Sequence, residues 1–282
     1  MEVRKVGVVG LGTMGAGIAQ VAVQAGFETV GREVSAELAE RGRASIDRYL
    51  TRGVDKGRLT HEERDAALAR LTLTTDLGGF ADCDLVIEAV LEELDLKREV
   101  FAQLDRVTRP EAVLATNTSA LSVSEIAEAT THPERVVGMH FFNPAPVLPL
   151  VEIVRARASS DEAVRTAYGW AERAGKQPVT CNDTPGFIVN RILIPLLNDC
   201  VRVLDEASVG PREMDKAMLN GAGWPMGPCA LVDLIGIDVH IHASEALHAK
   251  LGEERMMPPQ RLREMAEAGR LGRKTGRGFF DY

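Results

Sequence analysis

The N-terminal stretch constrains the fold more than any other part of the chain. An apolar, strand-like run from Lys5 to Gly10 leads directly into the motif Gly10-Leu-Gly-Thr-Met-Gly15. Small and apolar residues then recur at helical spacing from Ala16 to Gln24, and a second strand pattern covers Glu28 to Val34. A glycine-rich turn between a strand and a helix, followed by another strand, is typical of a βαβ unit that binds a dinucleotide.

Each glycine of the motif has a physical role. Gly10 permits the tight turn, Gly12 lets the backbone approach a pyrophosphate, and Gly15 lets the helix pack closely against the strand. The N-terminus of the helix adds N–H groups that stabilise the phosphate charge. We therefore expect the cofactor to contact the whole turn, which consists of Gly10, Leu11, Gly12, Thr13, Met14 and Gly15.

The acidic residue at the end of the second strand, Glu33, indicates which dinucleotide binds. A carboxylate here accepts hydrogen bonds from the adenosine ribose hydroxyls and repels a 2′-phosphate. NAD is therefore favoured over NADP, although the neighbouring cation Arg32 leaves NADP open. Gly31 is unusual inside a strand and indicates a close backbone approach.

The segment from Ala36 to Arg70 has a helical, strongly charged pattern that is broken at Gly53 and Gly57. The run Thr60-His-Glu-Glu63 is a capping-box signal for a second helix. The segment therefore predicts a helical hairpin inserted into the βαβ pattern. Its basic residues form either a solvated face or a grip on a second, phosphate-bearing ligand; they are Arg48, Arg52, Lys56 and Arg58.

Strand and helix patterns continue to alternate after the hairpin, which predicts a parallel, doubly wound α/β sheet. Strands are expected at 71–75, 84–89 and 112–117, and helices at 97–106 and 123–130. Glu88 and Glu92 fall where a strand meets its loop, the edge at which open α/β sheets bind ligands. Ser119 follows the next strand and is either a functional hydroxyl or a helix cap, whereas Ser122 fits a capping box with Glu125.

The stretch Val137-Gly-Met-His-Phe-Phe-Asn-Pro-Ala-Pro146 places His140 at the end of an apolar strand pattern. A carboxylate, Glu152, follows in the next short strand. Histidine titrates near neutrality, so a histidine with a carboxylate behind it is a natural acid–base pair. A surface or satisfied core histidine is the alternative. The adjacent Phe141 and Phe142 are candidate walls of a pocket.

Strand patterns stop near Asp183 and only helical patterns follow. We therefore place a boundary there, between a domain at 1–183 and a helical domain at 184–282. Before it we expect strands at 136–142, 151–155 and 177–181, and a helix at 160–175 capped through Ser159 and Glu162. After it, Asn182-Asp-Thr184 is expected to cap a helix opened by Pro185.

The first helix of the second domain, Phe187 to Leu204, is apolar on too many faces for a solvent-exposed helix, so we expect a partner subunit to cover it. Asn190 early in this helix is either a pocket residue or a satisfied core amide. His240 and His242 lack a third ligand at useful spacing, so no metal site is expected. The glycine- and arginine-rich tail at 271–282 could fold over a phosphate or be a solvated terminus.

Composition narrows the class of protein. A net charge of −8 argues against general binding to nucleic acid or anionic membranes. No run of 18 apolar residues occurs, so no membrane span is expected. The four cysteines show no CxxC pair and no targeting segment is evident, which indicates free thiols and a cytoplasmic location.

Five motifs in series resemble the L-3-hydroxyacyl-CoA dehydrogenase family, in the short single-function bacterial form of the 3-hydroxybutyryl-CoA dehydrogenase type. They are Gly10-Leu-Gly-Thr-Met-Gly15, Asn117-Thr-Ser119, His140-Phe-Phe-Asn-Pro144, Pro185-Gly-Phe-Ile-Val-Asn190-Arg and Gly272-Arg-Lys-Thr-Gly276. The resemblance covers essentially the whole chain. It implies a Rossmann-like domain followed by an all-α dimerisation domain, and the NAD-linked interconversion of L-3-hydroxyacyl-CoA and 3-ketoacyl-CoA.

The resemblance also implies roles for individual residues. His140 corresponds to the general base and Glu152 to the residue that orients it, while Ser119 and Asn190 correspond to groups that hold the substrate oxygen and the histidine. Lys56 corresponds to a residue that binds CoA. The positions that match NAD contacts are Glu33, Glu92, Lys97, Ser119, Asn143 and Lys274.

The chain departs from the family pattern in places that affect binding detail. Glu33 replaces the usual Asp, Gly31 an aliphatic residue, and Thr116 and Ala120 two serines, while Tyr49 and Glu93 replace a CoA-contacting Ser and a common Asn. Two other functions remain open at this point. One is a catalytically silent NAD-binding sensor, and the other is a dehydrogenase of a free hydroxy acid on the same fold.

Overall fold

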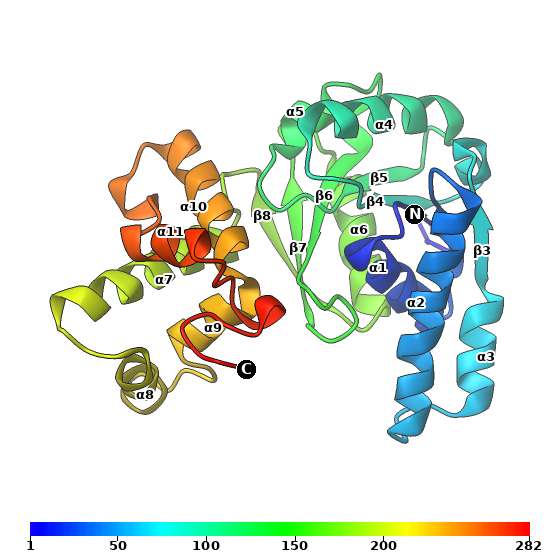
Figure 1. The fold of residues 1–282 in the computed structure, drawn as a ribbon. Helices are drawn as coiled ribbons and strands as arrows, with labels where there is room; N and C mark the ends of the chain where they lie inside the picture. The colour runs from blue at the N-terminus through cyan, green and yellow to red at the C-terminus, as the bar shows by residue number, and fades with distance from the viewer. The chain divides into compact units, whose positions relative to one another are not determined.

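The protein divides into two compact units, Met1–Thr184 and Pro185–Tyr282, in a computed structural model that describes residues 1–282 (Figure 1). The boundary placed after Asp183 from the sequence lies one residue before this division. The first unit combines a sheet with flanking helices, whereas the second is built from helices. The expected α/β unit followed by an all-α unit is confirmed.

The first unit contains one eight-stranded sheet in the order β3-β2-β1-β4-β5-β6-β7-β8. Neighbouring strands are parallel except for β6 and β7, which are antiparallel. The strands are β1 Lys5–Val9, β2 Glu28–Arg32, β3 Leu71–Thr74, β4 Leu85–Glu88, β5 Val113–Thr116, β6 Val136–Phe141, β7 Leu150–Arg155 and β8 Gln177–Asn182. The strand order reverses at β1, which lies between β2 and β4, so the carboxyl ends of these strands form the topological switch point.

Helices cover both faces of the sheet, as expected for a doubly wound fold (Figure 1). The helices of this unit are α1 Thr13–Gln24, α2 Ala36–Asp55, α3 His61–Ala69, α4 Leu94–Val107, α5 Val123–Ala127 and α6 Asp161–Arg173. Helices α1, α2 and α6 contribute Ile18, Ile46 and Trp170 to one apolar cluster with the strands. Helices α4 and α5 contact each other on the opposite face, where right-handed crossovers from β4 and β5 place them.

The inserted hairpin consists of α2 and α3, which contact each other (Figure 1). Thr60 and Glu63 form the expected capping box at the start of α3. Gly53 does not break the first helix, since α2 continues to Asp55, and Gly57 with φ of +64° follows its end. The break expected at Gly53 is therefore wrong, because a single glycine costs a helix only about 1 kcal/mol.

Gly31 has a physical reason that involves a side chain. A Cβ on Gly31 would lie 2.8 Å from Leu11 Cδ1, and one on Gly42 of α2 would lie 2.5 Å from Leu11 Cβ. The two glycines thus leave a notch that holds the buried Leu11 side chain between β2 and α2. The group that closely approaches Gly31 is therefore the side chain of Leu11, a residue of the glycine-rich turn.

Two expected helix caps are wrong. Ser160, not Ser159, accepts from the Ala163 N–H at the start of α6, while the buried Ser159 hydroxyl donates to the Val136 carbonyl. The segment at 182–184 does not cap a helix opened by Pro185. Its Asp183 carboxylate instead accepts from three groups at the start of α5, which are Ser122 Oγ and the N–H groups of Val123 and Ser124.

The second unit consists of helices and their connections and contains no strand. Its helices are α7 Val189–Glu206, α8 Pro211–Gly221, α9 Pro228–Ile235, α10 Ile237–Leu251 and α11 Gln260–Glu267. Helix α7 begins at Val189 because Gly186 and Phe187 adopt positive φ angles of +77° and +49°, which do not continue a right-handed helix. Leu197 and Val201 of α7 pack against Val232 of α9. No helix of the protein is both long and apolar enough to cross a bilayer.

The C-terminal tail is anchored within the second unit. The carboxylate of Asp233, which is 1% exposed, accepts from the N–H groups of Phe279 and Phe280 and from the Tyr282 hydroxyl. A Cβ on Gly278 would lie 2.0 Å from Asp233 Oδ1, so only glycine fits beside this carboxylate. The tail is therefore a packed part of the helical unit.

A buried histidine links α7 and α10. His240 Nε2 lies 2.8 Å from Asn198 Oδ1, and the histidine is 0% exposed. Burial lowers the pKa of His240 to about 4, because the charged imidazolium loses its hydration. The folded protein therefore holds this histidine neutral at pH values where the unfolded chain protonates it.

We expect this histidine to make the protein less stable in mild acid. Between pH 7 and pH 5 the unfolded state gains a proton at His240 and the folded state does not, which lowers the free energy of unfolding by about 2 kcal/mol. Urea unfolding at both pH values measures this loss in the wild type and in His240→Gln, where it should shrink. The exposed His242→Gln is the matched control, and an equal loss in all three proteins would contradict the assignment.

Candidate active site

A histidine–carboxylate pair lies at the end of β6. The antiparallel register pairs His140 directly with Glu152 of β7, so both side chains project on the same face of the sheet. His140 Nδ1 lies 2.6 Å from Glu152 Oε2. A carboxylate only accepts hydrogen bonds, so Nδ1–H is the donor. Both residues are buried, with 3% and 0% of their surfaces exposed.

The two phenylalanines after His140 face different environments. The Phe142 ring centroid is 4.5 Å from that of His140, and this half-buried ring flanks the imidazole. Phe141 points to the opposite face, where it is 2% exposed and packs edge-on against Trp170. The expectation that both rings line a pocket is wrong for Phe141, because side chains alternate between the faces of a strand.

The glycine-rich turn has the geometry that a pyrophosphate requires. Gly10 adopts a φ of +85°, and a Cβ on Gly15 would lie 1.7 Å from the Gly10 carbonyl oxygen. A Cβ on Gly12 would meet nothing within 4 Å, so the backbone there borders open space. Helix α1 starts at Thr13 without a side-chain cap, which leaves its first N–H groups to bind an anion.

A hollow of about 250 Å³ adjoins this turn. Its lining includes Gly12 and Thr13 of the turn, Glu33, and Arg41 of α2. Glu33 Oε1 accepts from the Leu11 N–H at 2.6 Å, so the carboxylate also holds the turn in place. These groups suit the adenosine half of a dinucleotide.

A larger hollow of about 330 Å³ lies in the helical unit and is lined by residues such as Arg261 and Phe279. No predicted site residue lines it.

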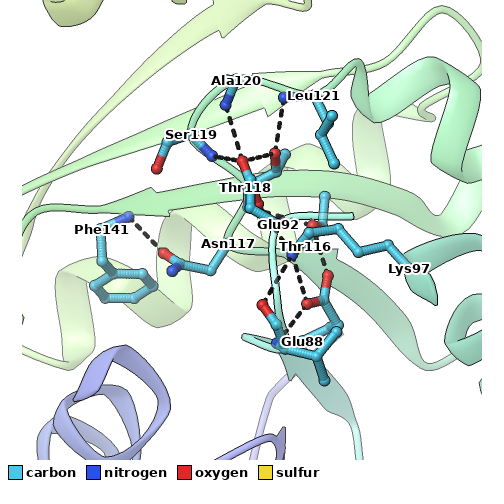
Figure 2. A network of polar contacts seen from close by, with 11 residues as sticks. Glu88, Glu92, Lys97, Thr116, Asn117, Thr118, Ser119, Ala120, Leu121 and Phe141 are labelled. Carbon is cyan, nitrogen blue, oxygen red and sulfur yellow. Dashed lines mark hydrogen bonds and ion pairs between the residues drawn. The ribbon is translucent and has the colours of Figure 1, made fainter. Parts of the chain in front are cut away.

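Ser119 is the exposed residue of a largely buried loop that follows β5 and is held by Glu92 (Figure 2). Glu92 Oε1 accepts from Thr118 Oγ1 at 2.6 Å, from Ser119 N at 2.8 Å and from Ala120 N at 3.1 Å. Burial raises the pKa of Glu92, but the Lys97 ammonium and these hydrogen bonds outweigh it and lower the pKa overall. Glu92 is therefore a carboxylate at neutral pH.

Lys97 is enclosed beneath the same loop. Its side chain is 1% exposed, and Nζ lies 2.7 Å from Glu88 Oε1 and 3.3 Å from Glu92 Oε2. Glu88 is 0% exposed. Of the residues matched to NAD contacts, Lys97 is therefore the one whose charge is already engaged by two carboxylates.

The remaining predicted residues lie on exposed or half-buried surface. Asn143 follows β6 and Lys56 follows α2, and both are exposed. Asn190 is half-buried in the first turn of α7, in the second unit. Lys274, also in the second unit, forms an ion pair with Asp238, with Nζ 2.6 Å from Oδ2.

Sequence reasoning assigned no role to three residues that support this edge. Asn117 Oδ1 accepts from the Phe141 N–H at 2.9 Å and so ties the Ser119 loop to the strand of His140. The Thr116 hydroxyl donates to Glu88 at 2.7 Å. Lys176 Nζ donates to the carbonyls of Ala145 and Leu148 and holds the loop after Asn143. Only Asn117 and Thr116 carried a signal, since both stand at the end of a predicted strand.

The arrangement can exchange a proton beside a bound dinucleotide. The glycine turn follows β1, Glu92 follows β4, Ser119 follows β5, and His140 stands near the end of β6. These four strands are adjacent and parallel, so all four groups occur at the same edge of the sheet.

No set of three or more His, Cys, Asp or Glu side chains is arranged to hold a metal ion.

Comparison with known proteins agrees with this geometry. Residues 5–184 match the NAD-binding domain of 3-hydroxyacyl-CoA dehydrogenase, and residues 186–282 match its C-terminal domain. The chain is 44% identical over 278 residues to a probable 3-hydroxybutyryl-CoA dehydrogenase of Deinococcus radiodurans, covering 99% of this chain and 100% of the relative. It is 45% identical over 282 residues to the 3-hydroxybutyryl-CoA dehydrogenase of Mycobacterium tuberculosis, covering 99% of each chain.

Solved structures lead to the same family. The crystal structure of Mycobacterium tuberculosis FadB2 superposes with a TM-score of 0.97 and 44% identity, covering 100% of both chains. Both units are therefore matched, by sequence and by fold. The chain belongs to the 3-hydroxyacyl-CoA dehydrogenase family.

Proposed function

We propose that the protein catalyses the NAD-dependent oxidation of a short-chain L-3-hydroxyacyl-CoA, such as 3-hydroxybutyryl-CoA, to the 3-ketoacyl-CoA, and the reverse reduction. The observation that carries this proposal is the His140–Glu152 hydrogen bond at the sheet edge that also bears the glycine turn. The names of the relatives supply the substrate class.

His140 acts as the general base of the oxidation. Its Nε2 takes the proton of the 3-hydroxyl as the C–H bond at C3 breaks, and NAD supplies the hydride acceptor when bound. Glu152 engages Nδ1, fixes the ring and stabilises the imidazolium that forms. In the reduction the imidazolium returns the proton to the ketone oxygen. Ser119 and Asn190 hold that oxygen and align C3 for transfer.

Cofactor binding divides between two ends of the dinucleotide. The glycine turn holds the pyrophosphate, and Glu33 binds the adenosine ribose and disfavours NADP. At the nicotinamide end we propose contacts from Glu92, Ser119 and Asn143, and we keep Lys274 as a further candidate because it matches a cofactor contact of the family. Lys97 supports this end from beneath, through its ion pair with Glu92.

The acyl-CoA is bound in part by the hairpin. Lys56 follows the end of α2. Within α2, the Cζ atoms of Arg48 and Arg52 each lie 5.7 Å from the ring centroid of Tyr49. These exposed cations and the ring suit a nucleotide that carries phosphates. A dehydrogenase of a free hydroxy acid would have no use for this surface. A silent NAD-binding sensor would have no use for the buried His140–Glu152 pair.

The second unit is proposed to form a homodimer. Ile192 and Val203 of α7, Leu234 of α9 and Val239 of α10 are large apolar residues with 40–61% of their surface exposed. A second copy would cover such a surface, since homodimer contacts are more apolar than ordinary surface.

The four cysteines are unpaired, which supports a reducing, cytoplasmic location.

Replacing the base tests the mechanism. His140→Gln should lower kcat by about two to four powers of ten, the usual contribution of general acid–base catalysis, and should leave NAD affinity nearly unchanged. NADH absorbance with acetoacetyl-CoA and with 3-hydroxybutyryl-CoA measures turnover in both directions. The exposed His132→Gln is the control, and full activity in His140→Gln would contradict the assignment.

Cofactor choice is tested at Glu33. Glu33→Ser removes the carboxylate that repels a 2′-phosphate, so the ratio of kcat/KM with NAD to kcat/KM with NADP should fall by about tenfold or more. Glu40→Gln, a nearby exposed substitution, should keep the wild-type ratio. An unchanged ratio in Glu33→Ser would show that another group sets the preference.

Recognition of CoA is tested at Lys56. Lys56→Ala should raise KM for acetoacetyl-CoA by about tenfold, the value of one charge-assisted phosphate contact, with KM for NADH unchanged. Lys216→Ala removes an exposed lysine of α8 and controls for net charge. Equal turnover of free acetoacetate and acetoacetyl-CoA by the wild type would favour the hydroxy-acid dehydrogenase instead.

A further inference from the structure

Glu88 is a fully buried carboxylate that the proposed chemistry does not use. It stands at the last position of β4 and is 0% exposed. Its Oε1 accepts from Lys97 Nζ and from the Val90 N–H, both at 2.7 Å, and its Oε2 accepts from Thr116 Oγ1 at 2.7 Å. Burial of a carboxylate is costly unless donors surround it, and three donors converge on this one.

Lys97 connects Glu88 to Glu92. One ammonium, 1% exposed, lies within 3.3 Å of an oxygen of each carboxylate (Figure 2). The lysine comes from α4, whereas Glu88 ends β4 and Glu92 lies in the loop between these two elements. Because the ammonium is excluded from solvent, its place is fixed by Glu88, and it fixes Glu92 in turn.

Glu92, in turn, accepts hydrogen bonds from the loop that bears Ser119. A single oxygen, Oε1, accepts from the Thr118 hydroxyl and from the N–H groups of Ser119 and Ala120. The Thr118 hydroxyl also accepts from the Leu121 N–H at 2.9 Å, which closes the loop on itself. The backbone on both sides of the exposed Ser119 side chain is therefore held by one carboxylate.

A second route joins Glu88 to the same loop through Thr116. The Thr116 hydroxyl donates to Glu88 and accepts from the Thr118 N–H at 3.3 Å. The next residue, Asn117, accepts from the Phe141 N–H in β6. The loop is thus fixed to Glu88 below and to the strand of His140 at its side (Figure 2).

We propose that Glu88, acting through Lys97 and Thr116, is a positioning residue that holds the Ser119 hydroxyl where the substrate oxygen must bind. Glu88 touches neither substrate nor cofactor. The proposal rests on the proposed function, because that function gives Ser119 its role. It also explains the hydrogen-bonding hydroxyl at Thr116, a buried site where valine would fill the same volume.

The first test compares variants of nearly equal shape. Glu88→Gln and Thr116→Val each remove one link and should lower kcat ten- to a hundredfold with KM for acetoacetyl-CoA within about threefold, since a misplaced group costs rate more than binding. Thr116→Ser keeps the hydroxyl and should restore kcat to within about twofold of wild type. Thr108→Val removes a buried hydroxyl bond elsewhere, to the Leu104 carbonyl, and should leave kcat unchanged.

The decisive test is a double-mutant cycle with Ser119→Ala. If Glu88 acts through Ser119, Glu88→Gln should change kcat by less than about twofold in the Ser119→Ala background. An equal factor in both backgrounds would overturn the proposal, because a general structural defect is independent of Ser119. Circular dichroism verifies folding, and Thr116→Val replaces Glu88→Gln in the cycle if the latter fails to fold.

The wild-type enzyme separates this proposal from the function on which it rests. No turnover of acetoacetyl-CoA by the wild type rejects the proposed function, and the positioning role with it. Turnover by the wild type together with wild-type kcat in both Glu88→Gln and Thr116→Val rejects the positioning role alone.

Discussion

The antiparallel pairing of β6 with β7 is the constraint on which the candidate site depends. It opposes His140 and Glu152 across two adjacent strands, and a slip of one residue would send Glu152 to the other face of the sheet. Burial of Glu152 without a donor would be costly, so the hydrogen bond to His140 and the strand register support each other. The proposed base is therefore oriented by two hydrogen-bonded strands, because both members of the pair lie within β6 and β7.

The parallel strands bring the rest of the site to the same edge, and they do so with a second buried carboxylate of a different kind. Glu152 is paired with a histidine, a side chain that can accept and return a proton, whereas Glu88 is paired with the Lys97 ammonium and also accepts from the Val90 N–H and the Thr116 hydroxyl. The first pair is suited to proton exchange and the second to holding a loop in one place. The glycine turn after β1 has a third role. Its backbone, rather than any side chain, is suited to bind the phosphates.

Much of this could be predicted from the sequence because it is encoded locally. The motif Gly10–Gly15, the alternation of strands and helices, and the capping box at Thr60 each occupy a short window with its own geometric requirement. The two wrong helix caps arose where a partner distant in sequence decides the outcome, since Asp183 caps α5 from 60 residues away and Ser159 bonds to β6. Other errors are local, because positive φ angles delay the start of α7 and α2 continues through Gly53. The central place of Glu88 was also hidden, since its partners converge only when β4, β5 and α4 are packed together.

The central claim is that Glu152 works through His140, and a double-mutant cycle on this pair tests it most directly. The kcat for 3-hydroxybutyryl-CoA oxidation is measured for the wild type, Glu152→Gln, His140→Gln and the double variant. Glu152→Gln alone should lower kcat by about tenfold or more, because the ring loses both its orientation and the carboxylate that stabilises the imidazolium. In the His140→Gln background the same change should cost less than about twofold. An equal loss in both backgrounds would show that Glu152 acts independently of His140 and would contradict the account.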